Sequence, residues 1–150
     1  MTLRCRPARR EDVAAVVALL HDDLLGEGRE HLADLTPYLA AFDAMAAETG
    51  NQLIVGEVSG RIVATYQLIF ISGLSHAGTR RAEIEAVRVA ANLRGQGLGA
   101  DLIRDAEARA RAAGCGVMQL TTNKARTRAH AFYCRLGYTP SHEGFKKALA

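Results

Sequence analysis

Residues 94–99 read Arg94-Gly95-Gln96-Gly97-Leu98-Gly99 and lie between a strand-like run, Ala82 to Val89, and a helix-like run, Ala100 to Ala112. Glycines in such a turn let backbone N–H groups come close to an anion, and the positive end of the following helix adds attraction. The segment therefore predicts a site for a phosphate-bearing ligand, most naturally the pyrophosphate of a cofactor.

The residues around this turn indicate which kind of glycine-rich loop it is. The phosphate-binding loop of nucleoside triphosphatases requires Gly, four residues and then Gly-Lys-Ser/Thr, a run that the sequence lacks. A dinucleotide fingerprint is formally present as Gly95, Gly97 and Ala100, but it requires an acidic residue at the end of the next strand. That strand, Val117 to Leu120, is followed by Thr121-Thr122-Asn123. The dinucleotide interpretation is therefore disfavoured, and a structural turn without a ligand stays open.

Four pieces of the second half of the chain, in this order and spacing, are informative together. They are Ile84-Glu85-Ala86-Val87-Arg88-Val89, Arg94-x-x-Gly97-x-Gly99, Asn123, and Ala129-His130-Ala131-Phe132-Tyr133-x-x-x-Gly137-Tyr138. This combination resembles the GNAT superfamily of acyl-CoA-dependent N-acetyltransferases. The match is close from about Ala82 to Tyr138, and elsewhere only the order of the predicted elements agrees.

Length and composition are those of an ordinary globular protein. The 150 residues suit a single domain, 1–150, and 49% of them are hydrophobic while 23% are charged. No apolar run reaches the roughly 20 residues of a membrane span, and the first residues lack the apolar core of a signal peptide. A cytoplasmic protein is expected. Cys5, Cys115 and Cys134 are widely spaced, and the five histidines are scattered, so we expect reduced thiols and no metal site.

Hydrophobic periodicity predicts a mixture of strands and helices. We expect strands at Leu3–Arg6, Gln52–Val58, Arg61–Ile71, Ala82–Val89, Val117–Thr121 and Glu143–Leu149. We expect helices from Val13, from Thr36 as N-cap, at Leu98–Ala113 and at Thr127–Leu136, with His21–Asp34 as a loop or broken helix. The alternation after residue 82 favours parallel pairing of two strands. The resemblance implies an α/β (mixed α+β) fold, with a partly antiparallel, partly parallel sheet of about six to seven strands, about four helices, and splayed central parallel strands.

The resemblance also implies how acetyl-CoA would bind, without a metal. The main chain of Val87 and Val89 would pair with the pantetheine arm as an added strand, and the N–H groups of residues 95–99 would hold the pyrophosphate. Asn123 would contact the pantetheine or phosphate region. The expected cofactor-binding residues are Val87, Val89, Arg94, Gly95, Gln96, Gly97, Leu98, Gly99, Asn123 and Tyr133.

Amide formation needs a neutral amine and therefore a base. With a pKa of about 10.4, only about one alkylamine in two thousand is neutral at pH 7, which corresponds to about 4.5 kcal/mol. Strict alternation would place Glu83, Glu85, Val87 and Val89 on one face of their strand. Glu85 matches the position at which many family members carry a glutamate, so we predict it as the general base, directly or through water. Glu83 is the second candidate.

Tyr133 is the second predicted catalytic residue. It belongs to the inward stripe of its helix with Ala129, Phe132 and Leu136, where a core tyrosine would also lie. The resemblance places such a tyrosine beside the cofactor sulfur, where a phenol could stabilise the departing thiolate by hydrogen bonding. Cys134 lies about 100° around the helix from Tyr133, so direct transfer in a ternary complex is preferred over an acyl-cysteine relay.

The predicted acceptor is a small, cationic primary amine. The first inter-helix segment holds Asp22, Asp23, Glu27, Glu30 and Asp34 against a single arginine, Arg29. An acidic rim would favour a cation. The tail Ser141–Lys147 is also similar to small-amine family members, including aminoalkylphosphonate acetyltransferases.

Two other functions are compatible with parts of the sequence. A non-catalytic acyl-CoA-binding regulatory module would keep the glycine turn without needing Glu85 and Tyr133, and a protein-lysine or peptide N-acetyltransferase stays open. Lys124, Arg126 and Arg128 form a basic cluster, either a solvated helix start or a contact to cofactor phosphates. A net charge of +3 and 5% aromatic residues disfavour nucleic acid. No membrane partner is expected, and a homodimer is possible because many family members are homodimers.

Overall fold

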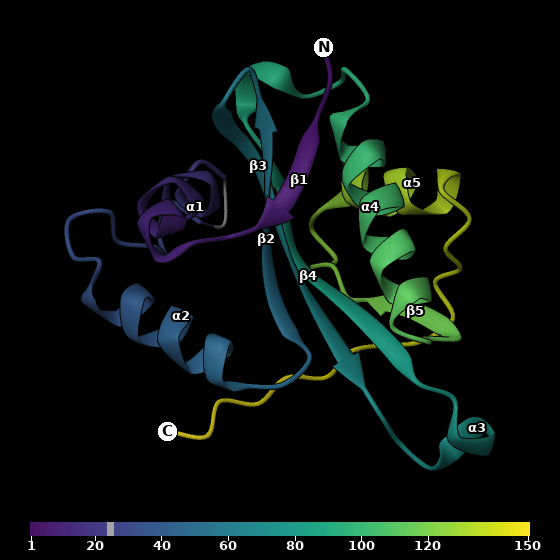
Figure 1. Ribbon diagram of the computed structural model, residues 1–150. Helices are drawn as coiled ribbons and strands as arrows, with labels where there is room; N and C mark the ends of the chain where they lie inside the picture. Colours follow the sequence, from purple (N-terminus) through teal and green to yellow (C-terminus); the bar gives the residue numbers. More distant parts are fainter. Residues whose placement is uncertain (24–25) are drawn as a thin grey trace. The chain divides into compact units, whose positions relative to one another are not determined.

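A long hairpin, β2 (Asn51–Val58) and β3 (Arg61–Ile71), forms the middle of the sheet (Figure 1). The computed structural model describes residues 1–23 and 26–150. Ser59 and Gly60, both with positive φ, make the tight turn that the sequence predicts between the two strands. β1 (Arg4–Pro7) and β4 (Arg81–Val89) pair with the hairpin in antiparallel fashion, and β5 (Val117–Leu120) follows β4 in a mixed sheet of order β1-β2-β3-β4-β5.

The helices include the four that the sequence predicts, in the predicted order, and one short helix, α3 (Ser75–Gly78), that the sequence does not predict. They are α1 (Val13–His21), α2 (Thr36–Ala47), the four-residue α3 (Ser75–Gly78), α4 (Leu98–Ala112) and α5 (Thr127–Arg135). Two short 3-10 turns, η1 (Arg10–Asp12) and η2 (Ala91–Leu93), precede α1 and α4. The chain divides into two compact units, Met1–Gln119 and Leu120–Ala150.

Helix α4 covers one face of the β2–β4 region, as Figure 1 shows. Its buried residues recur at helical spacing and are Leu98, Leu102, Ile103, Ala106 and Ala110. The sheet contributes the fully buried side chains Ile54, Tyr66, Leu68 and Ile84. Burial of each large aliphatic side chain contributes about 1.5–3 kcal/mol. This apolar layer fixes the position of α4, and so of its N-terminus, against the strands.

A buried phenol adds a polar link within this layer. The hydroxyl of Tyr66 donates a hydrogen bond of 2.5 Å to Asp105 Oδ2, which also accepts from Arg109 Nε at 2.8 Å. Burial is the main cause that raises the pKa of Tyr66, and the hydrogen bond to Asp105 adds to it. The phenol therefore stays protonated and joins β3 to α4.

Helices α1 and α2 lie on the opposite face of the sheet (Figure 1). Val13, Val16 and Val17 of α1 are buried, whereas α2 buries no residue fully. The inward residues of α2 are half-buried, so this helix covers the sheet less tightly than α4 does. The consequence is a cavity between α1, α2 and the sheet.

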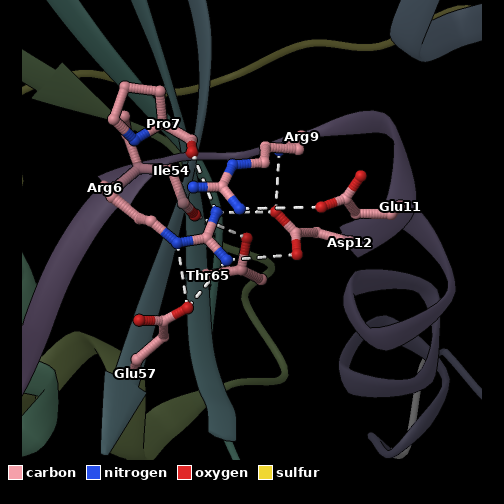
Figure 2. A network of polar contacts seen from close by, with 8 residues as sticks. All are labelled: Arg6, Pro7, Arg9, Glu11, Asp12, Ile54, Glu57 and Thr65. Atoms are coloured by element: carbon pink, nitrogen blue, oxygen red, sulfur yellow. Dashed lines mark hydrogen bonds and ion pairs between the residues drawn. The ribbon is translucent and has the colours of Figure 1, made fainter. Parts of the chain in front are cut away.

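An ionic network fixes the start of α1 to the sheet (Figure 2). Arg6 of β1 donates through Nη1 to Asp12 Oδ2 at 2.7 Å and through Nε to Glu57 Oε1 at 2.9 Å. Asp12, only 7% exposed, also accepts the Arg9 N–H at 2.7 Å. The hydrogen bonds from Arg6 are the main cause that holds the pKa of Asp12 below its usual value.

The sequence prediction was wrong about the C-terminal tail. A strand was expected at Glu143–Leu149, but residues 139–150 carry neither strand nor helix, and the described residues form five strands rather than six or seven. Phe145 and Leu149 are more than nine-tenths exposed. Gly144, Lys146 and Lys147 have weak strand preference, and within its own unit the tail has no partner strand.

The other boundaries agree to within about two residues, which is the normal uncertainty of helix and strand ends. Thr36 is the first residue of α2 rather than its N-cap, which is Leu35. The predicted loop at residues 21–34 includes residues 24 and 25, which lie outside the described residues.

Candidate active site

The turn before α4 depends on two glycines in the left-handed conformation. Gly95 has φ +77° and Gly97, the N-cap of α4, has φ +85°. A Cβ built on either would meet no atom within 4 Å. The glycines are therefore required by the backbone conformation and not by packing against the protein, and the space beside them is open.

This turn leaves several backbone donors at the start of α4 without a partner in the helix. The first intrahelical hydrogen bond runs from Asp101 N–H to Gly97 O at 3.2 Å, and no side chain caps the helix. The N–H groups of Leu98, Gly99 and Ala100 therefore have no intrahelical acceptor. Residues 95–97 are exposed. Open N–H groups at a helix N-terminus form a site for an anion.

The end of β4 presents main-chain groups on the side away from β3. Ala90 N–H donates to Val63 O at 2.8 Å, and Arg88 pairs with Thr65. Because partners alternate along an antiparallel pair, the N–H and C=O groups of Val87 and Val89 point away from β3. These are the two residues predicted to pair with a pantetheine arm.

Two arginine side chains contact these carbonyl oxygens. Arg88 Nη1 donates to Val87 O at 2.9 Å, and Arg94 Nε donates to Val89 O at 3.0 Å. Arg94 Nη2 also donates to Asp22 O at 3.0 Å, beyond the end of α1. Arg94, predicted from the sequence as a cofactor contact, thus links the glycine turn, β4 and the end of α1.

Strand β4 contains one more residue than β3 in the middle of their pairing. Gln67 pairs with Glu85, and Thr65 pairs with Arg88, so two residues of β4 lie opposite one residue of β3. Ala86 has φ +52°. In one class of β-bulge, the first of the two bulged residues has this left-handed conformation and is usually glycine. Here that residue is Ala86.

The bulge makes the predicted alternation wrong. Strict alternation placed Glu83, Glu85, Val87 and Val89 on one face, but the pairing places Arg88 on the face of Glu85 and Val89 on the α4 face. Glu83 and Glu85, which precede the bulge, do share a face as predicted. A bulge reverses alternation because it adds one residue to a repeat of two.

The two candidate bases have different surroundings. Glu83 Oε2 accepts a hydrogen bond of 3.5 Å from Gln119 Nε2, and Gln119 Oε1 accepts one of 2.9 Å from Arg81. Glu85 is half-buried, directly before the bulge and opposite Gln67, whose side chain lines the cavity beneath α1 and α2. Glu85 is therefore the carboxylate nearer in the strand to Val87 and Val89 and next to the cavity.

The sequence reasoning missed an ion pair that joins the end of α1 to β4. Arg88 Nη2 lies 3.1 Å from Asp23 Oδ2, with both side chains only 12–13% exposed. The residues are 65 positions apart, so no local pattern indicates the contact. Asp23, expected on an acidic rim, is thus a structural partner of Arg88.

Other carboxylates of the predicted rim are also bound to protein groups. Glu30 Oε1 accepts a hydrogen bond of 3.1 Å from the Tyr38 hydroxyl. Asp34 accepts one of 3.0 Å from the N–H that begins α2, and this bond lowers the pKa of Asp34. Asp22 and Glu27 are exposed. Asp23, Glu30 and Asp34 therefore bind groups of the protein itself, which reduces the negative charge that this segment offers to a cationic acceptor.

The second unit contains the two remaining predicted residues. Asn123 Oδ1 accepts a hydrogen bond of 2.9 Å from Ala125 N–H, which stabilises the turn before α5. Tyr133 is half-buried, with its ring edge-on to Phe132 at 5.1 Å and to Tyr138 at 5.8 Å between centroids. The inward stripe of α5 is confirmed as its half-buried face. The roles of Asn123 and Tyr133 stay predictions.

Comparison with known proteins identifies the family. The model of the acetyltransferase (GNAT) family matches residues 14–138. The chain belongs to the GNAT acetyltransferase family. A relative from Salmonella typhimurium (strain LT2), an aminoalkylphosphonate N-acetyltransferase, is 35% identical over an alignment that covers 94% of this chain and 97% of the relative. This GNAT protein is therefore an acetyltransferase.

Solved structures agree with this assignment of the fold. A crystal structure named as a transcriptional regulator from Bacillus halodurans C-125 has a TM-score of 0.94 at 38% identity, covering 99% of this GNAT chain and 100% of that one. A protein assigned as an acetyltransferase from Agrobacterium tumefaciens str. C58 has a TM-score of 0.85 at 28% identity, covering 97% and 99%. The GNAT fold predicted from the sequence is confirmed.

Two further features concern all the residues that the structure describes. Among residues 1–23 and 26–150, no helix is long and apolar enough to cross a membrane. In the same residues, no group of three or more His, Cys, Asp or Glu side chains is placed to hold a metal ion. The predictions of a single domain, a cytoplasmic location and the absence of a metal stay predictions.

Proposed function

We propose that this chain is an acetyl-CoA-dependent N-acetyltransferase that acetylates the primary amine of a small acceptor by direct attack in a ternary complex. The observation that carries the proposal is the open start of α4, where the N–H groups of residues 98–100 have no intrahelical acceptor and no side-chain cap. A diphosphate at this position would accept several hydrogen bonds and interact with the helix dipole.

Strand β4, beside the glycine turn, has main-chain groups that could bind the pantetheine arm of the cofactor. The main-chain groups of Val87 and Val89 point away from β3, so an extended ligand can pair with them as an added strand. Arg88 and Arg94, which now donate to these two carbonyls, would have to share them with or yield them to the ligand. In this proposal, acetyl-CoA extends from the glycine turn, which binds its diphosphate, along β4, which pairs with its pantetheine arm.

Glu85 is the proposed general base. It removes a proton from the ammonium form of the acceptor, directly or through water, so that the neutral amine attacks the thioester carbonyl. The new C–N bond forms as the C–S bond breaks, the electron pair of that bond leaves with the sulfur, and the remaining surplus proton of the attacking nitrogen passes to the thiolate, directly or through water. The Tyr133 phenol is proposed to stabilise this thiolate by a hydrogen bond, on the basis of the family resemblance.

The acceptor class rests on the curated relative. An aminoalkylphosphonate N-acetyltransferase that matches nearly the whole chain at 35% identity supports a small molecule with a primary amine. The similar B. halodurans structure is named as a transcriptional regulator. A non-catalytic acyl-CoA-binding module is therefore the alternative function that the test must distinguish.

The test is acetyl-CoA turnover by the full chain, followed as thiol release, over aminoalkylphosphonates, diamines, alkylamines, amino sugars and a lysine peptide. We expect turnover with a small amine, and a fall in kcat/KM of about 10²–10⁴ for Glu85→Gln. Glu83→Gln, on the same strand and face, is the matched control and should stay near wild type. Tyr133→Phe should lower kcat more than it raises the KM for acetyl-CoA.

Three results would overturn the proposal. Calorimetric binding of acetyl-CoA with no turnover of any amine would identify a non-catalytic module. A preference for the lysine peptide over every small amine would identify a peptide acetyltransferase. A larger loss in Glu83→Gln than in Glu85→Gln would transfer the role of base to Glu83.

A further inference from the structure

The cavity on the Glu85 face of the sheet is lined mainly by apolar side chains from two helices. It measures about 170 Å³ and lies between α1, α2 and strands β2–β4. Val16, Val17 and Leu20 of α1 form one wall, and Phe42 and Met45 of α2 form the other. An apolar cavity of about 150 Å³ is large enough to bind benzene. This space therefore suits an apolar group of about six carbons.

The polar side chains that line the cavity have partners within the protein. Thr65 Oγ1 donates to a backbone carbonyl of β2 at 2.8 Å. Gln67 Nε2 donates to Asn51 Oδ1 at 2.8 Å, and the Tyr38 hydroxyl donates to a carboxylate of the α1–α2 segment at 3.1 Å. A polar ligand would have to compete with these bonds, whereas an apolar ligand would leave them intact.

The cavity adjoins the proposed base. Ala86, the bulge residue next to Glu85 in sequence, lines the cavity, and so does Gln67, which pairs with Glu85 across the ladder. Directly paired residues have Cβ atoms about 4.5–5.5 Å apart. A ligand whose apolar end fills the cavity therefore has its other end within reach of the Glu85 carboxylate.

From the juxtaposition of this apolar cavity with Glu85 we infer that the cavity is a subsite for the hydrocarbon substituent of the acceptor, so that the preferred substrates are primary amines carrying an alkyl or aryl group of about four to six carbons. The inference rests on the proposed function, because it takes Glu85 as the base. It separates this chain from an enzyme for aminoalkylphosphonates, since a phosphonate dianion in contact with aliphatic walls would lose its hydration without compensation.

Two α2 variants with the same chemical change test the subsite. Ala41 lines the cavity and is also exposed, so the cavity opens along this edge of α2. Ala41→Leu would fill that opening, whereas Ala40→Leu adds the same side chain at an exposed residue that does not line the cavity. Met45→Ala enlarges the cavity and keeps the test valid if Ala41→Leu does not fold.

The measurements are kcat/KM for acetylation of unbranched amines from ethylamine to octylamine, and calorimetric binding of 2-phenylethylamine. Wild type and Ala40→Leu should gain about fourfold in kcat/KM per methylene until the cavity is full at about six carbons. Ala41→Leu should reach its plateau at a shorter chain, and Met45→Ala at a longer one. Ala41→Leu should also weaken 2-phenylethylamine binding by at least tenfold.

The outcomes distinguish the subsite from the catalytic proposal. A flat chain-length profile, equal profiles for Ala41→Leu and Ala40→Leu, or aminoalkylphosphonates outperforming every alkylamine would overturn the subsite while leaving the acetyltransferase proposal in place. Binding of 2-phenylethylamine that Ala41→Leu abolishes, without turnover of any amine, would support the cavity as a binding site and overturn the catalytic proposal instead.

Discussion

Substitution of Gly97 by alanine separates the two tasks of the glycine turn, which are to form the start of α4 and to bind a diphosphate. Gly97 has φ +85°, and a Cβ there would meet no protein atom within 4 Å. Gly60, in the β2–β3 hairpin turn, has φ +77° and is equally open. Gly60→Ala is therefore a control with the same backbone cost at a turn distant in sequence from the proposed site.

The expected loss of stability follows from the backbone alone. An L-residue in the left-handed region costs about 1–2 kcal/mol, and the stiffer unfolded chain of the alanine variant offsets about 0.4–1 kcal/mol of it. Both variants should thus lose about 1 kcal/mol in the free energy of unfolding. Urea denaturation, with an unchanged m-value, measures this loss.

Binding should distinguish the two variants. The Gly97 Cβ would enter the open space beside the amide donors, and relaxation of the turn would misalign their N–H groups. Loss of one charge-assisted hydrogen bond costs about 1.5–3 kcal/mol, so Kd for coenzyme A should rise about 10- to 100-fold in Gly97→Ala. Gly60→Ala should bind coenzyme A as wild type does.

Calorimetry with two ligands makes the result specific to the phosphates. Pantetheine lacks the diphosphate, so its affinity should differ little between wild type and Gly97→Ala. If Gly97→Ala and Gly60→Ala bind coenzyme A within twofold of each other, the amides at the start of α4 do not hold the diphosphate, and the reasoning from the helix terminus is refuted.

Two further predictions concern Asp12 and Cys5. Asp12→Asn should lower the free energy of unfolding at pH 7 by about 1.5–3 kcal/mol, because it weakens charge-assisted bonds to Arg6. The pKa of Asp12 is lower in the folded than in the unfolded state, so the extra stability of wild type is fully present above the unfolded pKa of about 3.9. It is lost as the pH falls through the lower folded pKa. Urea unfolding at pH 7 and at pH 3 should show this decrease in the stability difference. Burial raises the pKa of Cys5 to about 11, so iodoacetamide at pH 8 should alkylate exposed Cys134 well before Cys5, as peptide mass spectrometry can measure. Equal stability differences at both pH values, or equal labelling rates, would contradict these predictions.

The sequence predicted those parts of the fold whose signals are local. Ser59-Gly60 between β-branched runs indicated a hairpin, and Gly97 before an amphipathic run indicated the start of α4, because both depend on glycine conformation and periodicity. The prediction of a strand at residues 143–149 was wrong because it depended on a distant partner and not on a local signal. A strand exists only where another strand accepts its hydrogen bonds, and residue type alone does not report that partner.

The sequence indicates where the glycine turn and the adjoining strand lie, but not the geometry of the side chains around them. The glycine turn and the outward main chain of Val87 and Val89 agree with what the family resemblance implies, since these depend on backbone conformation near one motif. The ion pair between Arg88 and Asp23 was missed because its members are distant in sequence. The cavity beneath α2 was missed because it depends on how tightly a helix packs, which periodicity does not measure.

The bulge at Ala86 accounts for the remaining error and explains why the site is arranged as it is. Without the extra residue, Arg88 would lie on the α4 face, among fully buried apolar side chains such as Leu98 and Leu102, where an unpaired guanidinium would be very costly. With it, Glu85 and Arg88 share the face of α1, and Arg88 reaches Asp23. The left-handed strain at Ala86 is therefore the local cost of placing a carboxylate and a guanidinium on one side of the strand.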